Sequence, residues 1–434
     1  MKETWEKMIG ILKTDVVPAT GCTEPVSLAF AAAVAARELG EPAETIQARV
    51  SANLMKNGMG VMVPGTGRPG LYIAAAVGAL GGDANAGLQV LEGLTPEVVA
   101  AGAAMADAGR VTVEIAREVP YVLYAEALLI GKCHRVKVCI ADNHTQVIRI
   151  EKDGTVVFQK KRDDGSGKED KVKFLQSLSI QEIIDFAEQV PVQAIAFMKT
   201  AATMNETLSR EGLHGEYGLR IGATLTKHQE KGLMGKDLQS MVVIRTVGAS
   251  DARMGGAKLP AMTNSGSGNQ GISATMPVVA VADYVHAEPE ERLRAVTLSH
   301  MTAIYAHAFL PKLSALCAAL TACVGAAAGM AWLLAAQHDR QVVIDAICSM
   351  TGDLPGMICD GAANSCSMKV ASASAAAYKA VLLALEGIRV GGNDGLVAFD
   401  VDECIRNIGM LACQGMKETD PEILRIMLHK NQNG

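Results

Sequence analysis

The chain has 434 residues, of which 49% are hydrophobic and only 4% aromatic, so it can bury a large core built mainly from small and aliphatic side chains. Its 40 basic and 46 acidic residues give a formal net charge of -6, which provides no basic field of the kind that nucleic acids require. We therefore expect no nucleic-acid partner.

The N-terminal segment predicts two helices with a short loop between them. Residues 2–13 and 26–38 have helical patterns, and the second is an alanine-rich run that follows a proline, as helix starts often do. The first segment mixes acidic and lysine side chains and lacks the apolar run and small-residue cleavage site of a signal peptide. We therefore expect a cytoplasmic protein.

The following segments predict a separate α+β region. Residues 45–52 alternate as a strand does, and residues 56–70 contain so many glycines that we expect an irregular loop there. Helical patterns continue to about residue 108. Residues 110–160 then change to a period of two in segments separated by turn residues, which predicts an antiparallel sheet. The charged run at 160–173 predicts an exposed linker.

The rest of the chain predicts helices. From about residue 179 the pattern is almost wholly helical, with glycine-rich loops near 248–271, 352–366 and 391–395. The sequence thus predicts an α+β fold of two parts. Residues 1–173 form an N-terminal α+β part with an antiparallel sheet, and it packs on a mainly α-helical C-terminal part, residues 174–434.

One apolar stretch raises the question of a membrane. Residues 313–336 are uncharged and long enough to span a bilayer. They are rich in Ala, Gly, Ser, Thr and Cys rather than in Leu, Ile and Phe, and flanking basic asymmetry is lacking. We therefore expect a helix that is buried on all sides, and no membrane partner.

Ten cysteines without an export signal indicate thiols rather than a disulfide framework. Cys22 lies at the predicted start of the alanine-rich helix, where unpaired N–H groups and the helix dipole stabilise a thiolate. A lowered pKa would make Cys22 a base or nucleophile. The competing interpretation is a small buried side chain, which free cysteine often is.

Cys359 and Cys366 flank a polar loop whose Asp, Gly, Asn and Ser residues let the two thiols converge. Two thiols are not a complete metal site, so a third ligand must come from elsewhere, and Cys317 or Cys323 in the apolar helix could supply it. A cluster on three cysteines leaves one iron open as a Lewis acid. None of the tight CxxC spacings is present, so buried spectator cysteines remain an alternative.

A polar, glycine-spaced loop at 264–271 precedes a helix at about residue 272, an arrangement that suits a carboxylate. Arg253 could act as a bidentate clamp, and a second glycine-rich loop could line the same site. The pattern does not match a phosphate loop or a dinucleotide fingerprint, and a flexible connection is the alternative. The candidate substrate-binding residues are Arg253, Asn264, Ser265, Ser267, Asn269, Lys56 and Asn57.

Several long motifs together resemble the L-cysteine desulfidase family, from about residue 15 to residue 430. They are GCTEP around Cys22, NLMKNGMGV from Asn53, VPGTG from Val63, SDARMGG, NSGSGNQG, the helix from SALC to GAAAGMAW, and MICDGAANSC. The helical C-terminal part also resembles the α domain of bacterial iron-sulfur L-serine dehydratases. The resemblance implies an oxygen-sensitive 4Fe-4S cluster and no pyridoxal phosphate.

By position, the resemblance implies cluster ligation by Cys317, Cys359 and Cys366, and a catalytic role for Cys22, whereas Cys323 has no counterpart. It implies β-elimination of L-cysteine to pyruvate, ammonia and hydrogen sulfide. Serine dehydratases end in a cysteine that occupies the open iron, whereas this chain ends in HKNQNG, which removes one reason to assign it L-serine.

Three alternatives remain open at this point. The first is the same cluster chemistry on L-serine or another amino acid, including a D-amino acid. The second is a non-enzymatic iron-sulfur sensor or amino-acid-binding protein. The third is a pyridoxal enzyme, for which no lysine has a convincing Schiff-base context. A homodimer is expected only because such dimers are common.

Overall fold

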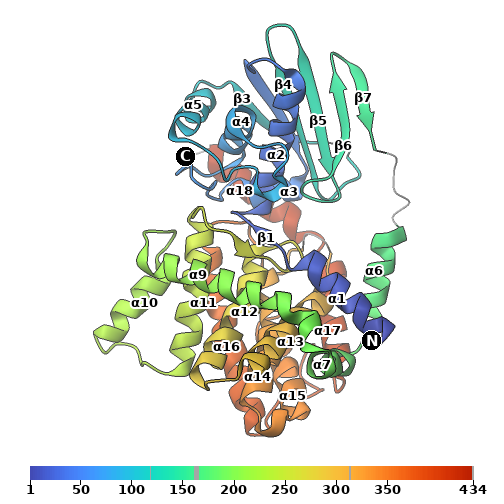
Figure 1. Ribbon diagram of the computed structural model, residues 1–434, viewed down its shortest axis with the longest axis vertical. Coiled ribbons are helices and arrows are strands. Elements are labelled where there is room, and N and C mark those ends of the chain that lie inside the picture. The colour runs from blue at the N-terminus through green and yellow to red at the C-terminus, as the bar shows by residue number, and fades with distance from the viewer. Residues whose placement is uncertain (118, 161–165, 312–313, 433–434) are drawn as a thin grey trace.

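The computed structural model describes residues 1–117, 119–160, 166–311 and 314–432. Two lobes lie one above the other (Figure 1): the upper lobe contains a sheet with helices against it, and the lower lobe is built of helices. A two-stranded ribbon of β1 (Pro18–Ala19) and β8 (Ala261–Met262) lies at the junction. The predicted α+β class, with a helical C-terminal part, is confirmed.

The upper lobe, called the sheet lobe here, contains six strands in the order β3-β2-β4-β5-β6-β7. The strands are β2 (Thr45–Val50), β3 (Val111–Ile115), β4 (Tyr124–Ile130), β5 (Arg135–Ala141), β6 (Val147–Lys152) and β7 (Thr155–Gln159). The strands pair antiparallel as predicted, except that β2 and β3 run parallel. A parallel pair needs a crossover connection, and the helices between these two strands provide it.

Four helices belong to the sheet lobe and position one edge of the site. They are α2 (Thr23–Leu39), α3 (Ala52–Gly58), α4 (Leu71–Gly81) and α5 (Pro96–Asp107). The alanine-rich α2 packs against β4, β5 and α4, and its buried residues extend along almost its whole length. Small side chains let it lie between a sheet and another helix, as its composition suggests.

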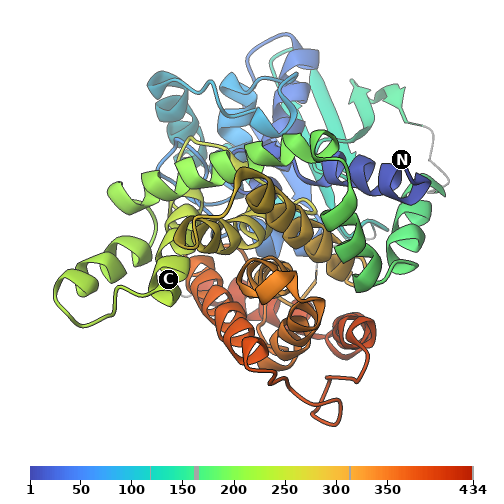
Figure 2. The same cartoon turned by 60° about the horizontal axis from the view of Figure 1, so that its bottom comes forward.

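The lower lobe, called the helical lobe here, is organised around α14 (Ala318–Leu334), which packs against the helices α12, α13, α15 and α16. Its helices are α1 (Glu3–Asp15), α7 (Ile180–Gln189), α8 (Val192–Ile195), α9 (Lys199–His214), α10 (Ile221–Glu230), α11 (Leu238–Met254), α12 (Gly268–Tyr284), α13 (Pro289–His307), α15 (Arg340–Asp353), α16 (Cys366–Leu385) and α17 (Val401–Met410). Figure 2 shows this lobe from below, with α10 projecting from it.

The buried central helix agrees with the prediction for the apolar stretch at 313–336, of which residue 313 lies outside the described residues. A methyl group at Gly325 would lie 2.2 Å from the carbonyl oxygen of Ser299, so α13 and α14 touch backbone to backbone. Within the described residues, α16 is the one helix long and apolar enough to cross a membrane, and 50% of its most apolar window is buried in the protein.

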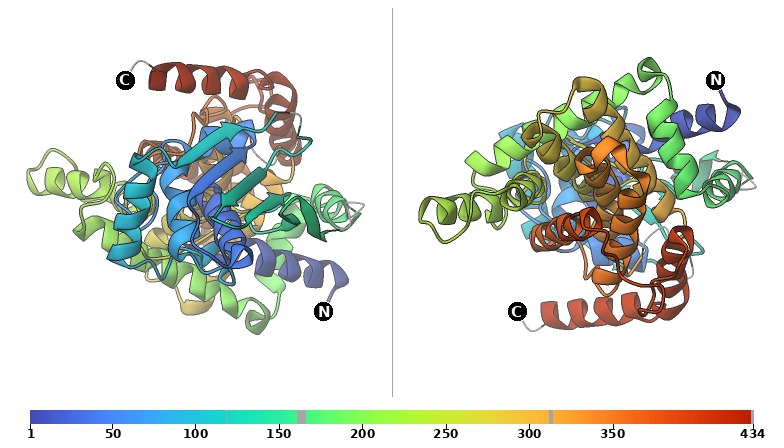
Figure 3. Two further views of the ribbon diagram at one scale, coloured as in Figure 1. Left: turned by 90° about the horizontal axis from the view of Figure 1, so that it is seen from above. Right: turned by 90° about the horizontal axis from the view of Figure 1, so that it is seen from below.

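Each end of the chain packs on the lobe that the other half of the sequence forms. Met8 and Leu12 of α1 belong to the core of the helical lobe. Leu424 of α18 (Thr419–Gln432) belongs to the core of the sheet lobe, and Leu428 packs against that core. In Figure 1 the N-terminus lies near α7, whereas the C-terminus lies beside the sheet lobe. Figure 3 shows α18 running along one side of the molecule.

Three predicted loops are wrong in part. Residues 56–58 complete α3, and residues 248–254 complete α11, because the glycines there serve close packing rather than a turn. A methyl group at Gly248 would lie 3.0 Å from the Ser209 carbonyl oxygen. In the predicted linker at 160–173, residues 161–165 lie outside the described residues, and α6 (Ser166–Gln176) is helical.

The 3-10 and π turns are η1 (Gly87–Gln89), η2 (Ala196–Met198), η3 (Ala336–His338) and η4 (Leu411–Gly415).

Candidate active site

The candidate cysteines lie at the starts of helices. Cys22 is the N-cap of α2, Cys317 is the N-cap of α14, and Cys366 is the first residue of α16. Cys359 lies in the loop that leads to α16. Because the first N–H groups of a helix are unpaired and its dipole is positive there, each of these helix starts favours a thiolate or another negative group.

A short antiparallel contact brings Cys317 and Cys359 side by side. The N–H of Cys317 donates to the carbonyl of Met357 at 2.9 Å, and the N–H of Cys359 donates to the carbonyl of Ala315 at 2.7 Å. Cys366 turns back toward this loop, and its Sγ lies 3.7 Å from the carbonyl oxygen of Gly361. Residues that are far apart in sequence, on the loop before α14 and the loop before α16, thus form one surface.

The three thiols are close enough to influence one another's ionisation. Burial, and next the Cys359 thiol, raise the pKa of Cys317 to about 12. Burial also raises the pKa of Cys366, and the Cys359 thiol adds to the increase. The ammonium group of Lys369, which pairs with Asp360, opposes both increases. Thiols held together against this repulsion suit a cationic group that can replace their protons.

Among the described residues, no three His, Cys, Asp or Glu side chains are grouped closely enough to hold one metal ion. A 4Fe-4S cluster offers a separate iron to each thiolate, so cysteines that bind it stand farther apart than the ligands of one ion. Cys323, the alternative third ligand, is fully buried inside α14 with the Ser273 hydroxyl beside it.

Cys22 faces the cysteine loop across a small apolar cluster. Val61 and Met254 are buried with it, and Ala362 and Cys366 pack against the same cluster. The Sγ of Cys22 lies 3.8 Å from the Sδ of Met254. The sequence suggested a lowered thiol pKa at this helix start. In the structure, burial outweighs the helix dipole and raises the pKa of Cys22 to about 12, although the Arg253 guanidinium opposes the increase.

Arg253 is a buried cation beside Cys22. Its Nη1 donates to the Sδ of Met254 at 3.3 Å, and no described residue accepts a hydrogen bond from its Nε. A methyl group at Gly268 would lie only 2.1 Å from that Nε, so only glycine fits at this position. The sequence did not mark Gly268. Burial of a guanidinium without an acidic partner is costly, and an incoming carboxylate would remove that cost.

The polar loop before α12 is mostly occupied by its own hydrogen bonds. Asn264 is buried, donates to the His300 carbonyl at 3.1 Å and accepts from the Gln270 side chain at 3.0 Å. Ser265 Oγ donates to Asn264 at 3.0 Å, and Ser267 caps α12. Asn264, Ser265 and Ser267 thus shape the loop, which contacts the start of α2 through Thr23 Oγ1 and the Gly266 carbonyl at 3.4 Å.

Asn269 lies on α12 rather than in the loop, and its Oδ1 accepts a hydrogen bond from Ser250 Oγ at 3.3 Å. Ser250 Oγ also lies 3.0 Å from Ser367 Oγ, next to Cys366. His300, which the sequence did not mark, contacts Asn264 Nδ2 through its Nδ1 at 3.1 Å. These polar residues form a buried network behind the loop.

Lys56 and Asn57 lie at the end of α3. The Lys56 ammonium has two hydrogen-bond partners, whereas one side-chain atom of Asn57 has none among the described residues. Lys56 Nζ is 2.6 Å from Asp420 Oδ1 and donates to the Cys359 carbonyl at 3.1 Å. Asn57 Nδ2 donates to Glu24 Oε1 at 3.2 Å, whereas its buried Oδ1 accepts no hydrogen bond within the described part of the chain. Glu24, on the first turn of α2, was not among the predicted site residues.

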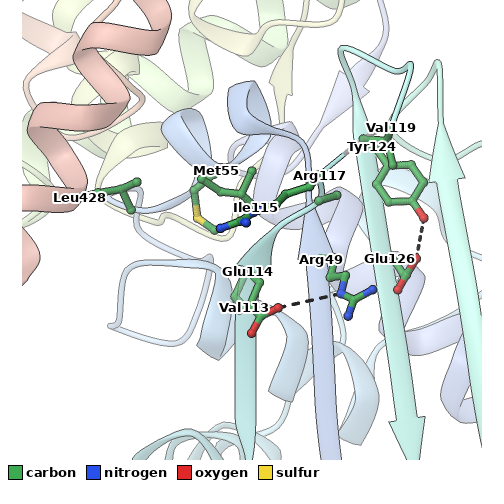
Figure 4. Close-up of a pocket in the computed structure, with 11 residues that line it drawn as sticks. Arg49, Met55, Val113, Glu114, Ile115, Arg117, Val119, Tyr124, Glu126 and Leu428 are labelled. Carbon is green, nitrogen blue, oxygen red and sulfur yellow. Dashed lines mark hydrogen bonds and ion pairs between the residues drawn. The ribbon is translucent and has the colours of Figure 1, made fainter.

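Two cavities lie near these elements. The cavity drawn in Figure 4, about 860 Å³, lies at the end of β2, β3 and β4 and is lined by Arg49, Met55, Arg117, Tyr124 and Glu126 among others, but by none of the candidate cysteines. The second, about 810 Å³, lies between the cysteine loop and the start of α18, and Ile358, Asp360 and Lys369 line it. Of these two cavities, the second lies closer to the proposed metal ligands, because Ile358 and Asp360 flank Cys359 in the chain.

Comparisons with known proteins place these features in a family. A profile of serine dehydratase alpha chains matches residues 85–425. A UPF0597 protein of Chromobacterium violaceum is 56% identical over 426 residues, which cover 98% of each chain. UPF0597 protein YE0448 of Yersinia enterocolitica is 54% identical over 98% of this chain and 97% of its own. UPF0597 protein YhaM of Escherichia coli K12 is 52% identical over 98% of each chain.

Proposed function

The chain belongs to the serine dehydratase alpha chain family, and from this premise we propose that it is a lyase that removes the β-substituent of L-cysteine, giving pyruvate, ammonia and hydrogen sulfide. One observation carries the proposal. Cys366 packs against the apolar cluster that contains Cys22, the Cys359 thiol lies near enough to Cys317 and Cys366 to affect their pKa values, and Arg253 lies beside Cys22. A small amino acid that entered between them would meet a base, a carboxylate partner and a metal site at once.

The proposed metal group is a 4Fe-4S cluster, held by Cys317, Cys359 and Cys366. When bound, a cluster with one iron open supplies a Lewis acid toward the leaving group. The residues fit such a group because three thiols are gathered from separate loops, two of them at helix starts. Cys359 is half-buried rather than fully enclosed, so the loop that carries it stays accessible.

Arg253 and Asn57 are the proposed anchors of the substrate. The guanidinium of Arg253 would bind the carboxylate, since it is buried and its Nε is unpaired among the described residues. The free Oδ1 of Asn57, together with the neighbouring Glu24, would accept from the ammonium group. Two anchors fix the Cα–H bond in one direction, and positioning of this kind contributes several kcal/mol to catalysis, up to about 7–11 kcal/mol in well-oriented systems.

Cys22 is the proposed base. As a thiolate, with Arg253 as its counter-charge, it would take the proton from Cα, and the released electron pair would form the Cα–Cβ double bond as the Cβ–S bond breaks. The sulfur leaves as sulfide. The resulting aminoacrylate tautomerises to an imine, and water then hydrolyses the imine to pyruvate and ammonia.

The lining next to Cys22 supports a thiol rather than a hydroxyl leaving group. Val61 and Met254 are fully buried there, and neither carries a strong hydrogen-bonding group. A serine hydroxyl that enters such a lining without a partner loses about 1–3 kcal/mol of hydrogen bonding relative to water. A thiol, which hydrogen bonds weakly, loses much less.

The test is anaerobic purification with iron and sulfide reconstitution, followed by a visible spectrum and assays of sulfide and pyruvate with L-cysteine, D-cysteine and L-serine. We expect a brown protein that releases sulfide and pyruvate in equal amounts from L-cysteine. A brown protein that acts only on serine or on the D-isomer would reassign the substrate. A brown protein without turnover would favour a sensor, and a colourless protein that takes up no iron would refute the cluster.

A further inference from the structure

A buried lysine joins the sheet lobe to the loop that carries the candidate cysteines. Lys56, on α3 of the sheet lobe, is only 1% exposed. Its Nζ lies 3.1 Å from the carbonyl oxygen of Cys359 and 2.6 Å from Asp420 Oδ1. The other oxygen of Asp420 accepts from Asn53 Nδ2 at 3.0 Å. The ammonium group of Lys56 therefore links α3 to two other parts of the chain that are far from it in sequence.

The surroundings of Lys56 are shaped for this contact. Gly361 has φ +100°, and a methyl group there would lie 2.7 Å from the Lys56 carbonyl oxygen, so the cysteine loop lies directly on the backbone of α3. Asp420 is in the first turn of α18, where the helix dipole favours a carboxylate. Burial of a lysine is costly unless its charge is paired and its hydrogen bonds are satisfied, and Asp420 and the Cys359 carbonyl do both.

We propose that Lys56 is a positioning residue, which fixes the main chain at Cys359 and so holds this thiol in the geometry that the metal group needs. Asp420 holds Lys56 in place, and α18 is thereby part of the metal-binding apparatus although it supplies no ligand. The link to metal binding rests on the proposed function. The ordering of the cysteine loop by Lys56 does not, because it depends only on contacts between protein atoms.

The first experiment reads the loop itself in the metal-free full-length chain. Cys359 is alkylated with iodoacetamide, and the rate is followed by mass spectrometry in wild type, in Lys56→Met/Asp420→Leu and in Asp420→Asn. We expect Cys359 to react about tenfold faster in the double variant, because removal of the ion pair frees the loop. The rate in Asp420→Asn should lie between the two. The exposed Cys413 is the internal standard, and its rate should not change.

Glu422→Gln is the matched control, since it removes one negative charge from the same helix, and the carboxylate of Glu422 pairs with the exposed Arg425 rather than with Lys56. It should leave the labelling of Cys359 unchanged. A merely structural role of the ion pair would lower the melting temperature and speed the labelling of all buried cysteines alike. Selective labelling of Cys359 at an unchanged rate for Cys323 would show local positioning. The proposal would be overturned if Cys359 reacted at an unchanged rate in both variants. If the double variant does not fold, an unchanged rate in Asp420→Asn alone would overturn it.

The second experiment follows the reconstituted cluster by its visible absorbance after exposure to air. The double variant should lose it about tenfold faster than wild type, whereas Glu422→Gln should match wild type. If wild type binds no cluster, the proposed function fails while the labelling result still decides the role of Lys56. If wild type binds a cluster and the variants retain it equally long, the proposed function stands and Lys56 has no part in holding the metal group.

Discussion

At the scale of single residues, the site depends on charges and thiols that are buried with few partners. Cys22 and Arg253 illustrate this, because burial raises the pKa of the thiol while the guanidinium lowers it. Each group makes the charged form of the other less costly. The proposed chemistry therefore requires both, and substitution of either should affect turnover more than folding.

Replacement of Cys22 by Ser tests the proposed base. We expect turnover of L-cysteine to fall by about 10²–10⁴-fold, the usual contribution of a positioned base, because a serine hydroxyl is a far weaker acid than a thiol. The visible spectrum of the reconstituted protein should stay unchanged. Cys413→Ser, at an exposed position, is the control and should keep full activity. Joint loss of the spectrum and of turnover would instead make Cys22 a metal ligand.

His300 gives the chain a predictable sensitivity to acid. Burial lowers the pKa of His300 to about 3, against an ordinary value of 6.5. The folded state thus keeps this imidazole neutral while the unfolded state protonates it, so its contribution to stability is complete above pH 6.5 and is lost as the pH falls toward 3. At pH 5 the loss amounts to about 2 kcal/mol.

Between pH 7 and pH 5 we therefore expect the free energy of unfolding to fall by about 2 kcal/mol less in His300→Gln than in wild type, whatever the substitution does at pH 7. Urea unfolding at several pH values measures this. His307, whose pKa burial also lowers, to about 4, remains in both proteins and contributes equally. Identical slopes for His300→Gln and wild type would show that His300 is not neutral in the folded protein.

The sequence was enough to select the candidate thiols but not to predict which residues surround them. Motif and position select Cys317, Cys359 and Cys366, and the Cys359 thiol lies near enough to the other two to affect their pKa values, while their role as ligands stays a prediction. The partners of Lys56 could not be predicted, since Asp420 is distant in sequence and nothing local requires an acid there. Asn264 and Ser267 were predicted to bind substrate, but tertiary contacts and a helix cap engage their side chains.

At the scale of elements, the helical lobe depends on small residues where helices cross. Composition correctly predicted α2 and α14, which are buried along almost their whole length, and the alternation of side chains predicted the strands of the six-stranded sheet. The same reasoning failed at residues 248–254, where glycine density suggested a loop. Glycine in that helix allows α9 and α11 to touch, and a single sequence does not separate a packing glycine from a turn glycine.

Gly325→Ala tests the closest of these contacts. The added methyl group would lie 2.2 Å from the Ser299 carbonyl oxygen, so α13 and α14 must separate, and we expect a loss of about 1–3 kcal/mol in the free energy of unfolding. Gly10→Ala is the matched control, because nothing lies within 4 Å of its new methyl group. It should gain up to about 1 kcal/mol from helix propensity. Equal effects on urea unfolding would mean that the crossing is not tightly packed.

At the scale of the whole molecule, the two lobes are linked by exchanged ends. The helix α1 completes the core of the helical lobe, and α18 completes the core of the sheet lobe. No local pattern in the sequence predicts this exchange, because an amphipathic helix does not specify which apolar surface it will cover. The parallel pairing of β2 and β3 was missed for a similar reason, since the alternation of side chains is the same in both strand directions.

Leu424→Ala tests whether α18 stabilises the sheet lobe. The side chain is 7% exposed, and we expect its truncation to lower the free energy of unfolding by about 2–3 kcal/mol. Hydrogen exchange should show the loss of protection in β4, far from the mutated residue in sequence. Ile426→Ala, at a position that is 49% exposed on the same helix, is the control and should change neither measurement. Protection lost only within α18 would show that this helix is dispensable to the sheet.

The exchange of ends also has a consequence for biosynthesis. A ribosome makes the strands early, but Leu424 and the acidic partner of Lys56 emerge only after the whole helical lobe has been translated. The sheet lobe therefore cannot reach its final packing before the helical lobe has been translated, and Lys56 has no contact with Asp420 until then. Any group that this loop binds would accordingly be inserted after the helical lobe has been translated rather than before it.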